Sequence, residues 1–223
     1  MFGRWFRRQP PRAPLDPREA YELWAPSYPP LAHNGLMELE ERTLLGLLPE
    51  VAGSVALDVG CGSGRYLRRL AERGALRTFG CDLTPAMLAR ARAVEPRLAL
   101  GDAAALPFAG AHFDLVLAGL VVGHCANLGQ VICELGRVLR PGGVLAYSDI
   151  HPMGTLAGWE RTFADAAGRE HVVRQHLHLP SDHLRALQAA GLQLEALEEP
   201  RGEQAGRFSQ WPALLALRAR KPA

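Results

Sequence analysis

The sequence has no long apolar run and no paired cysteine motif. No stretch approaches the roughly 18–20 apolar residues that a membrane span needs, and residues 1–14 lack the apolar core of a secretion signal. We therefore expect a cytoplasmic protein without a membrane span. The cysteines form no CxxC pair, so we expect reduced thiols in place of a disulfide scaffold; they are Cys61, Cys81, Cys125 and Cys133.

Lysine is also scarce, and charge of either sign is not in excess. Lys221 is the only lysine among 25 basic residues, which face 23 acidic ones, for a net charge of +2. This balance does not favour a nucleic-acid partner. Basic residues cluster only at the start of the chain, between prolines, at Arg4, Arg7, Arg8 and Arg12. We interpret residues 1–16 as a flexible basic arm, with surface or nucleic-acid binding as the alternative.

Residues 17–223 are predicted to form one domain. Apolar segments at 55–59, 77–82, 98–100, 113–118 and 144–148 alternate with helical patterns. Strand–helix alternation produces a parallel sheet with helices on both faces. Segments 192–197 and 213–220 have no helix between them, so they can pair antiparallel. We predict an α/β fold with a Rossmann-like, seven-stranded, mostly parallel sheet and a C-terminal antiparallel strand pair.

The flanking segments are assigned by local signals. Helical patterns at 17–24 and 36–48 precede the sheet. Thr84 is expected to cap the helix that Pro85 opens, and Ser181 to cap a helix that ends before Gly191. Residues 151–180 are predicted to be a long irregular insertion.

A glycine-rich turn follows the first strand. Val55–Val59 runs into Gly60-Cys-Gly62-Ser-Gly64, and a helix begins next. Glycine permits positive φ and lets a ligand approach the main chain, while the amides of a helix N-terminus favour an anionic group. A dinucleotide fingerprint would place its third glycine where Arg65 stands, and no P-loop Lys-Ser/Thr pair is present. The turn predicts a nucleotide-like ligand.

Three acids lie at the carboxyl ends of strands, at the same predicted sheet edge. Asp58 precedes the glycine turn and suits a ligand that carries an ammonium group. Asp82 ends the second strand, where a carboxylate can accept hydrogen bonds from ribose hydroxyls. Asp102 ends the third strand, where it can accept from an adenine amino group. Together they point to S-adenosylmethionine.

The motifs of the chain resemble those of class I S-adenosylmethionine-dependent methyltransferases. The matching segments are Leu57-Asp-Val-Gly-Cys-Gly-Ser-Gly64, Gly80-Cys-Asp-Leu-Thr-Pro-Ala-Met-Leu88, Gly101-Asp-Ala-Ala-Ala-Leu-Pro-Phe108, Phe113-Asp-Leu-Val116 and Glu134-Leu-Gly-Arg-Val-Leu-Arg-Pro-Gly-Gly143. Within that class, the chain is similar to the ubiquinone and menaquinone C-methyltransferases and to the malonyl-carrier-protein methyltransferase of biotin synthesis. The resemblance implies methyl transfer by in-line displacement to a small-molecule or acyl-carrier-bound acceptor.

The resemblance also implies residue roles. Asp58, Gly60 and Gly62 would hold the methionine end, with Cys61 in the same loop. Asp82 and Leu83 would hold the ribose, and Asp102 and Ala103 would hold the adenine. Ala118 and Gly119 would lie beside the methionine moiety. Residues 17–50 would form a lid in which Tyr28 closes over the cofactor, although Pro29-Pro30 replaces the polar residue that the family usually has next. Apart from the resemblance, the length of segment 151–180 and its Trp159, Arg161 and Phe163 indicate part of the acceptor pocket or a lid.

Candidate bases follow the fourth and fifth strands. They are His124, Asp149 and His151, of which any would be needed only if the acceptor carries a proton. We assign no metal, although His176, His178, Asp182 and His183 have ligand types that zinc accepts. Two other functions stay open: a cofactor-binding scaffold without catalysis, and an NAD-dependent reductase, against which Arg65 and Asp58 argue.

Overall fold

The structure, a computed structural model, describes residues 13–202 and 211–223. Most of the expected basic arm, residues 1–12, therefore lies outside the described residues. Residues 13–16 of the expected arm lie within the described part of the chain. Leu15 N donates to Val172 O at 2.8 Å, and Arg174 N donates to Leu15 O at 2.9 Å. No described helix is long and apolar enough to cross a membrane.

A seven-stranded sheet forms the centre of the molecule, in the order β3-β2-β1-β4-β5-β9-β8. Strand β9 is antiparallel to both β5 and β8, whereas β1 to β5 pair in parallel. The predicted architecture, with its C-terminal antiparallel pair, is confirmed. The strands are β1 (Val55–Val59), β2 (Arg77–Asp82), β3 (Leu98–Leu100), β4 (Phe113–Gly119), β5 (Leu139–Ile150), β8 (Gln193–Glu198) and β9 (Leu214–Arg220).

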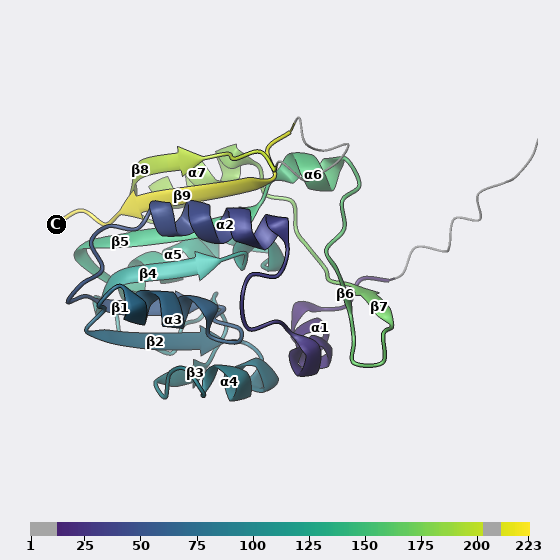
Figure 1. Ribbon diagram of the computed structural model, residues 1–223. Coiled ribbons are helices and arrows are strands. Elements are labelled where there is room, and N and C mark those ends of the chain that lie inside the picture. The colour runs from purple at the N-terminus through teal and green to yellow at the C-terminus, as the bar shows by residue number, and fades with distance from the viewer. Residues whose placement is uncertain (1–12, 203–210) are drawn as a thin grey trace, which may run out of the picture.

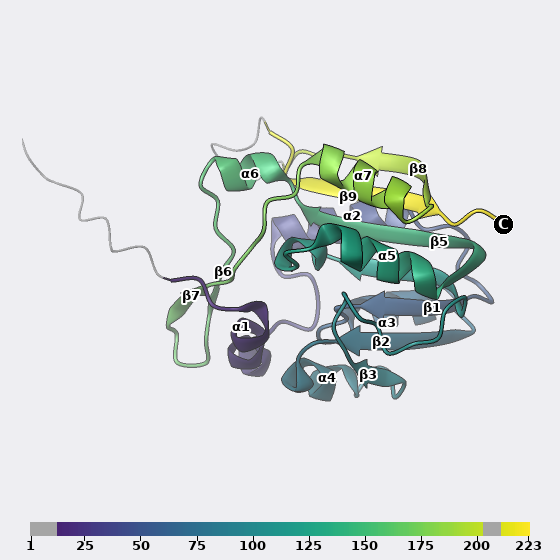
Figure 2. The same ribbon diagram turned by 180° about the vertical axis from the view of Figure 1, so that it is seen from behind.

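Helices cover both faces of the sheet (Figures 1 and 2). Because side chains alternate along a strand, β4 sends Leu115 and Leu117 to one face and Val116 and Ala118 to the other, and all four are buried. A strand with both faces covered is expected to be mostly apolar, and in β4 Asp114 is the one charged residue. One face is covered by α2 (Gly35–Gly46) and α3 (Arg65–Glu72), and the other by α5 (Leu128–Val138) and α7 (Pro180–Ala189).

Two helix starts differ from the prediction. Thr84 precedes α4 (Pro85–Ala91) but makes no side-chain cap; its N–H donates to Asp82 Oδ1 at 2.9 Å instead. Helix α7 begins at Pro180, so Ser181 lies inside its first turn. The Asp182 carboxylate accepts from Leu179 N at 2.8 Å and satisfies the backbone there. In both places an aspartate accepts from the N–H of the residue just before the helix, and the expected hydroxyl cap is not made.

The predicted irregular segment 151–180 contains regular structure. It holds α6 (Pro152–Leu156) and an antiparallel hairpin of β6 (Thr162–Ala164) and β7 (Glu170–Val172). Asp165 closes the hairpin turn, since its Oδ1 accepts from the N–H groups of Ala167 and Arg169, both at 2.9 Å. Three-residue strands are too short to leave a readable period in the sequence, which explains the wrong expectation.

The hairpin packs against α1 (Pro17–Trp24) and the short turn η1 (Ala25–Ser27). Trp24 stacks on Phe163 with ring centroids 4.9 Å apart, and Ala20, Phe163 and Val173 are buried together. This unit stands beyond the carboxyl ends of the parallel strands, where their arrowheads point in Figure 1. It therefore covers the sheet edge at which the predicted site residues gather.

Candidate active site

A cavity of about 860 Å³ lies at the carboxyl ends of the parallel strands, beneath α1. Its walls come from the loops after β1, β2, β3 and β4 and from the segment 16–28. The structure thus brings together segments far apart in sequence. The predicted cofactor residues that line it are Tyr28, Gly60, Gly62, Asp82, Leu83, Asp102, Ala103 and Gly119.

The glycine turn needs its glycines for two reasons. Gly60 and Gly62 adopt φ of +67° and +54°, in the left-handed region. A Cβ on Gly60 would also lie 2.3 Å from Val121 Cγ2. Gly62 N donates to Asp82 Oδ2 at 2.8 Å, which ties the turn to the end of β2. The turn is therefore fixed against the neighbouring strand at the cavity wall.

Two acids face the cavity in different surroundings. Asp82 is almost buried, and this burial raises the pKa of its carboxyl above the ordinary value. Each of its oxygens already accepts one backbone N–H, from Gly62 and Thr84, and each keeps acceptor capacity for a ligand. Asp102 is exposed, and its Oδ1 accepts from Ala104 N at 2.8 Å.

Three predicted cofactor residues do not line the cavity. Cys61 and Ala118 are buried, 5% and 0% exposed. Asp58 is 1% exposed, and its Oδ2 has no hydrogen-bond partner among the described residues. Burial raises the pKa of the Asp58 carboxyl well above its usual range, against the opposing effect of Arg65. An unpartnered buried carboxylate oxygen is costly, and a cationic ligand group would relieve that cost.

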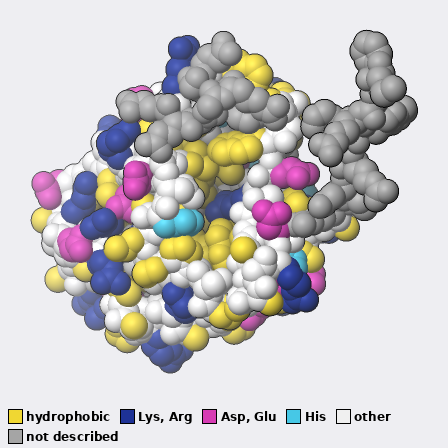
Figure 3. Space-filling model, turned by 45° about the vertical axis from the view of Figure 1, so that its right-hand side comes forward, with side chains coloured by type: hydrophobic (Ala, Val, Ile, Leu, Met, Phe, Trp, Pro, Cys, Tyr) yellow, Lys and Arg dark blue, Asp and Glu magenta, His cyan; other side chains and the backbone are white. Residues whose placement is uncertain are grey.

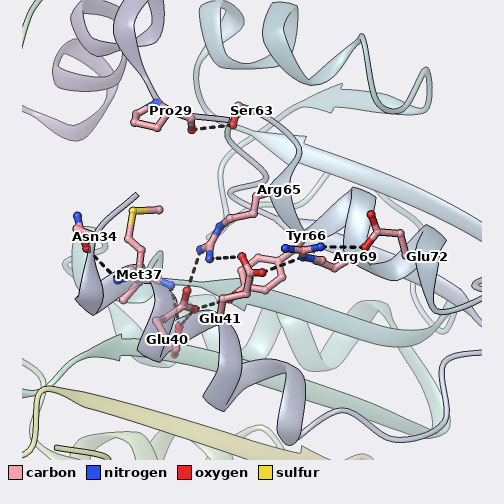
Figure 4. A network of polar contacts seen from close by, with 12 residues as sticks. Pro29, Asn34, Met37, Glu40, Glu41, Ser63, Arg65, Tyr66, Arg69 and Glu72 are labelled. Atoms are coloured by element: carbon pink, nitrogen blue, oxygen red, sulfur yellow. Dashed lines mark hydrogen bonds and ion pairs between the residues drawn. The ribbon is translucent and has the colours of Figure 1, made fainter. Parts of the chain in front are cut away.

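A network of buried polar contacts, which the sequence did not predict, lies next to the glycine turn (Figure 4). Glu40 of α2 is fully buried, and its Oε1 accepts from Tyr66 Oη and Ser148 Oγ, both at 2.7 Å. Its Oε2 pairs with Arg65 at 2.8 Å. Arg65, which replaces the third glycine of a dinucleotide fingerprint, also pairs with Glu41 at 3.0 Å. One arginine thus joins α2 to the first turn of α3.

The lid segment reaches the cavity despite its two prolines. Tyr28 lines the cavity wall, and its carbonyl accepts from Arg90 Nη2 at 2.7 Å. Pro29 O accepts from Ser63 Oγ at 3.5 Å, as Figure 4 shows. The departure from the family pattern at Pro29-Pro30 therefore leaves Tyr28 facing the cavity.

Of the three candidate bases, only His124 lines the cavity. Its Nδ1 lies 3.1 Å from Arg174 O, which requires a proton on Nδ1. Nε2 is then the acceptor for Tyr21 Oη and Arg161 Nη1, both at 3.1 Å. Burial, with the nearby Arg161, lowers the pKa of His124 to about 3. The imidazole is neutral with its lone pair engaged, so this arrangement offers no free base.

The other two candidates are buried outside the cavity lining. His151 caps α6, because its Nδ1 accepts from Met153 N at 3.2 Å, and its Nε2 lies 3.0 Å from Glu199 Oε1. Asp149 Oδ1 accepts from Ile150 N at 2.7 Å, and burial raises the pKa of Asp149 to about 7. The structure does not bring these two side chains to the site that the sequence predicted.

The histidine-rich segment does not assemble a metal site within the described residues, where no group of three or more ligating side chains converges. His178 Nε2 donates to Cys125 O at 2.8 Å. His183 is fully buried and stacks on Tyr147. These side chains have separate structural partners.

A second cavity of about 460 Å³ adjoins the first. It lies between the start of α2 and residues 159–162, which join α6 to the hairpin, and it shares Leu120 and Arg161 with the larger cavity. Leu120 has a φ of +58°, a conformation that a leucine rarely adopts. The sequence indicated an acceptor-side insertion at 151–180, but it gave no signal that residues of α2, or Ala213 just before β9, complete this cavity.

Comparisons with known proteins match this geometry. The Methyltransferase domain family matches residues 57–147. A malonyl-[acyl-carrier protein] O-methyltransferase of Dechloromonas aromatica is 30% identical over 202 residues, which cover 89% of this chain and 72% of that protein. The biotin biosynthesis bifunctional protein BioHC of Cellvibrio japonicus is 36% identical over 74% of this chain and 33% of its own length.

A malonyl-[acyl-carrier protein] O-methyltransferase of Serratia marcescens is 36% identical over 66% of this chain and 56% of that protein. For the BioHC and Serratia relatives, the match thus spans from a third to somewhat over half of their length. A solved S-adenosylmethionine-dependent methyltransferase of Mesorhizobium loti is 26% identical with a TM-score of 0.69, covering 81% of this chain and 97% of that one. The chain therefore belongs to the class I S-adenosylmethionine-dependent methyltransferases, and the expected family is confirmed.

Proposed function

We propose that this chain binds S-adenosylmethionine in the larger cavity and catalyses methyl transfer to a small-molecule or carrier-bound acceptor. The observation that carries the proposal is one cavity lined by a positive-φ glycine turn and by carboxylates after two successive strands. The residues that would hold the cofactor are those predicted from the sequence, with Asp82 for the ribose, Asp102 for the adenine and Gly60 to Gly62 for the methionine end.

Two features of the chain fit that cofactor. The unpartnered Oδ2 of Asp58 lies directly before the glycine turn and matches a ligand with an ammonium group. Gly62, with a φ of +54° and open space where a Cβ would stand, lets a ligand approach the main chain. Asp58 is covered in this structure, so we expect it to act from beneath the turn, where its charge favours a cation even without direct exposure.

When bound, S-adenosylmethionine supplies a methyl group already activated by a sulfonium. The tasks left to the protein are orientation and exclusion of water; in favourable models, orientation alone contributes about 7–11 kcal/mol. Tyr21 of α1 and Tyr28, which directly follows η1, both line the cavity on its covered side. His124, the one candidate base in the wall, is neutral and fully engaged. This supports an acceptor atom that needs no deprotonation.

A carboxylate oxygen is such an acceptor. Several relatives are named as O-methyltransferases of malonyl-[acyl-carrier protein]. We therefore propose O-methylation of a carboxylate as the reaction class, with in-line displacement of the methyl group.

Calorimetric titration with S-adenosylhomocysteine tests the proposal. The wild-type chain should bind it with a micromolar dissociation constant, and Asp82→Asn should weaken binding by about tenfold or more, because a bond to a charged group contributes about 1.5–3 kcal/mol. Asp182→Asn is the matched control, since Asp182 caps α7 outside both cavities. An unbound wild type, or equal loss in the two variants, would refute the cofactor assignment. Tight binding without methyl transfer from labelled cofactor to any carboxylate acceptor would favour the scaffold alternative.

A further inference from the structure

The second cavity meets the cofactor cavity at Arg161 and Leu120. Its volume, about 460 Å³, is within the range of small-molecule sites, roughly 300–1,000 Å³. A molecule in it would therefore lie against the cofactor cavity without entering it. This is the position that an acceptor must take.

Apolar side chains form most of its inner wall. Figure 3 shows a hollow on this face in which hydrophobic side chains surround a basic one. The buried members of the wall come from α2, the loop after β4, the end of β5 and the residue just before β9. The apolar residues that line the cavity are Trp24, Leu36, Met37, Leu39, Leu120, Ile150, Trp159 and Ala213.

Among the described residues of this wall, Arg161 is the only charged one that is half-buried. The four other charged residues of the lining are exposed, two acidic and two basic: Glu38, Glu160, Arg42 and Arg201. Arg161 Nη1 donates to Leu120 O at 3.3 Å and to His124 Nε2 at 3.1 Å, which fixes the guanidinium at the junction. Both acceptors are uncharged, since His124 is held neutral.

Within the part of the chain that the structure describes, no carboxylate forms an ion pair with Arg161, unlike Arg65, Arg69 and Arg137. Asp149 lies close enough to be influenced by the guanidinium, but its carboxyl is bonded to Ile150 N and does not pair with Arg161. A partly buried guanidinium without a counter-ion has donors available for a bidentate carboxylate.

We propose that the second cavity binds an amphiphilic monocarboxylate, with its carboxylate on Arg161 at the junction and its apolar body against the wall formed by Leu36, Leu39, Ile150 and Trp159. The inference rests on the proposed methyl-transfer function and deepens it by naming the acceptor class. It also departs from the named relatives, because a malonyl group has no apolar body to fill this wall.

Three probes separate the two halves of the proposed ligand. Octanoate carries both the charge and the chain, octan-1-ol carries the chain alone, and acetate carries the charge alone. The full chain is first saturated with S-adenosylhomocysteine, whose own binding is measured in the same calorimeter. Octanoate should bind at least tenfold more tightly than either partial probe, since an ionic hydrogen bond contributes about 1.5–3 kcal/mol and buried methylene groups about 0.8 kcal/mol each.

Arginine variants locate the charge. Arg161→Gln should weaken octanoate binding about 10- to 100-fold and leave octan-1-ol binding within about twofold. Arg161→Lys should retain part of the octanoate affinity, which also shows that the site tolerates substitution. Arg42→Gln is the matched control, because Arg42 lines the same cavity but is exposed; it should change octanoate affinity no more than twofold.

Each outcome supports or overturns a named part of the proposal. Octanoate binding no tighter than octan-1-ol, or equal losses in Arg161→Gln and Arg42→Gln, would overturn the role of Arg161. Malonyl-N-acetylcysteamine binding more tightly than octanoate would overturn the apolar body. Failure of S-adenosylhomocysteine to bind would refute the proposed function itself, whereas its binding together with loss of the octanoate preference refutes this inference alone.

Discussion

Replacing Glu40 by alanine should destabilise the chain more than the same replacement of the neighbouring Glu41. Glu40 is fully buried and receives hydrogen bonds from Tyr66, Ser148 and Arg65 at 2.7–2.8 Å. In the alanine variant, two buried hydroxyl groups lose their acceptor and Arg65 keeps only Glu41. Breaking one partner of a buried ion pair costs about 3–5 kcal/mol, a large part of the roughly 5–15 kcal/mol that stabilises a typical domain.

Urea unfolding followed by circular dichroism measures this cost. Glu41→Ala is the matched control, because Glu41 and Arg69, one of its two partners, are 12% and 35% exposed at their side chains; its cost should be about 1 kcal/mol. Glu40→Gln keeps the shape and part of the hydrogen bonding, so it should fall between the two.

A Glu40→Ala cost below about 1 kcal/mol, or one equal to that of Glu41→Ala, would refute the reasoning that this network holds α2 on α3. Binding provides a second readout. Arg65 begins α3 directly after the glycine turn, and a Cβ on Gly119, which lines the cofactor cavity, would lie 3.0 Å from Glu40 Oε1. The affinity of Glu40→Ala for S-adenosylhomocysteine should therefore fall severalfold at a temperature where the variant is still folded.

Three further predictions use pH and the glycine turn. Burial lowers the pKa of His183 to about 4, so this histidine binds a proton in the unfolded chain at a higher pH than in the folded one. The free energy of unfolding of the wild type should therefore fall by roughly 3 kcal/mol from this group between pH 6.5 and 4. Unfolding of His183→Phe across that range should lack this component. Burial raises the pKa of Asp149 to about 7, so its ionisation opposes folding as pH rises, and Asp149→Asn should gain stability over wild type at pH 8 by up to roughly 4 kcal/mol, with no gain at pH 4. Gly60→Ala should lower the free energy of unfolding by about 1–3 kcal/mol and weaken S-adenosylhomocysteine binding at least tenfold, because its Cβ would overlap Val121. Gly142→Ala is the control, since Gly142 has a φ of +76° and open space around it. It should lower the free energy of unfolding by about 1 kcal/mol and leave binding unchanged.

Local patterns in the sequence were sufficient to predict the sheet and the edge at which the larger cavity lies. Strand–helix alternation, the glycine turn and the acids after the strands are all such patterns, and a parallel sheet brings its carboxyl ends to one side. Asp82 and Asp102 could therefore be assigned to one cavity from their positions along the chain. Short elements such as β6 and β7 were not predicted, because three residues are too few to show the alternation of apolar and polar side chains that marks a strand.

The charge states and the second cavity, by contrast, follow from tertiary packing. His124 is a plausible base in the sequence, yet contacts from Tyr21, Arg161 and Arg174, distant along the chain, hold it neutral and engaged. Glu40 has the pattern of a surface acid on a helix, yet packing buries it completely. Burial and pairing depend on which segments fold against each other, and this information is absent from any local pattern.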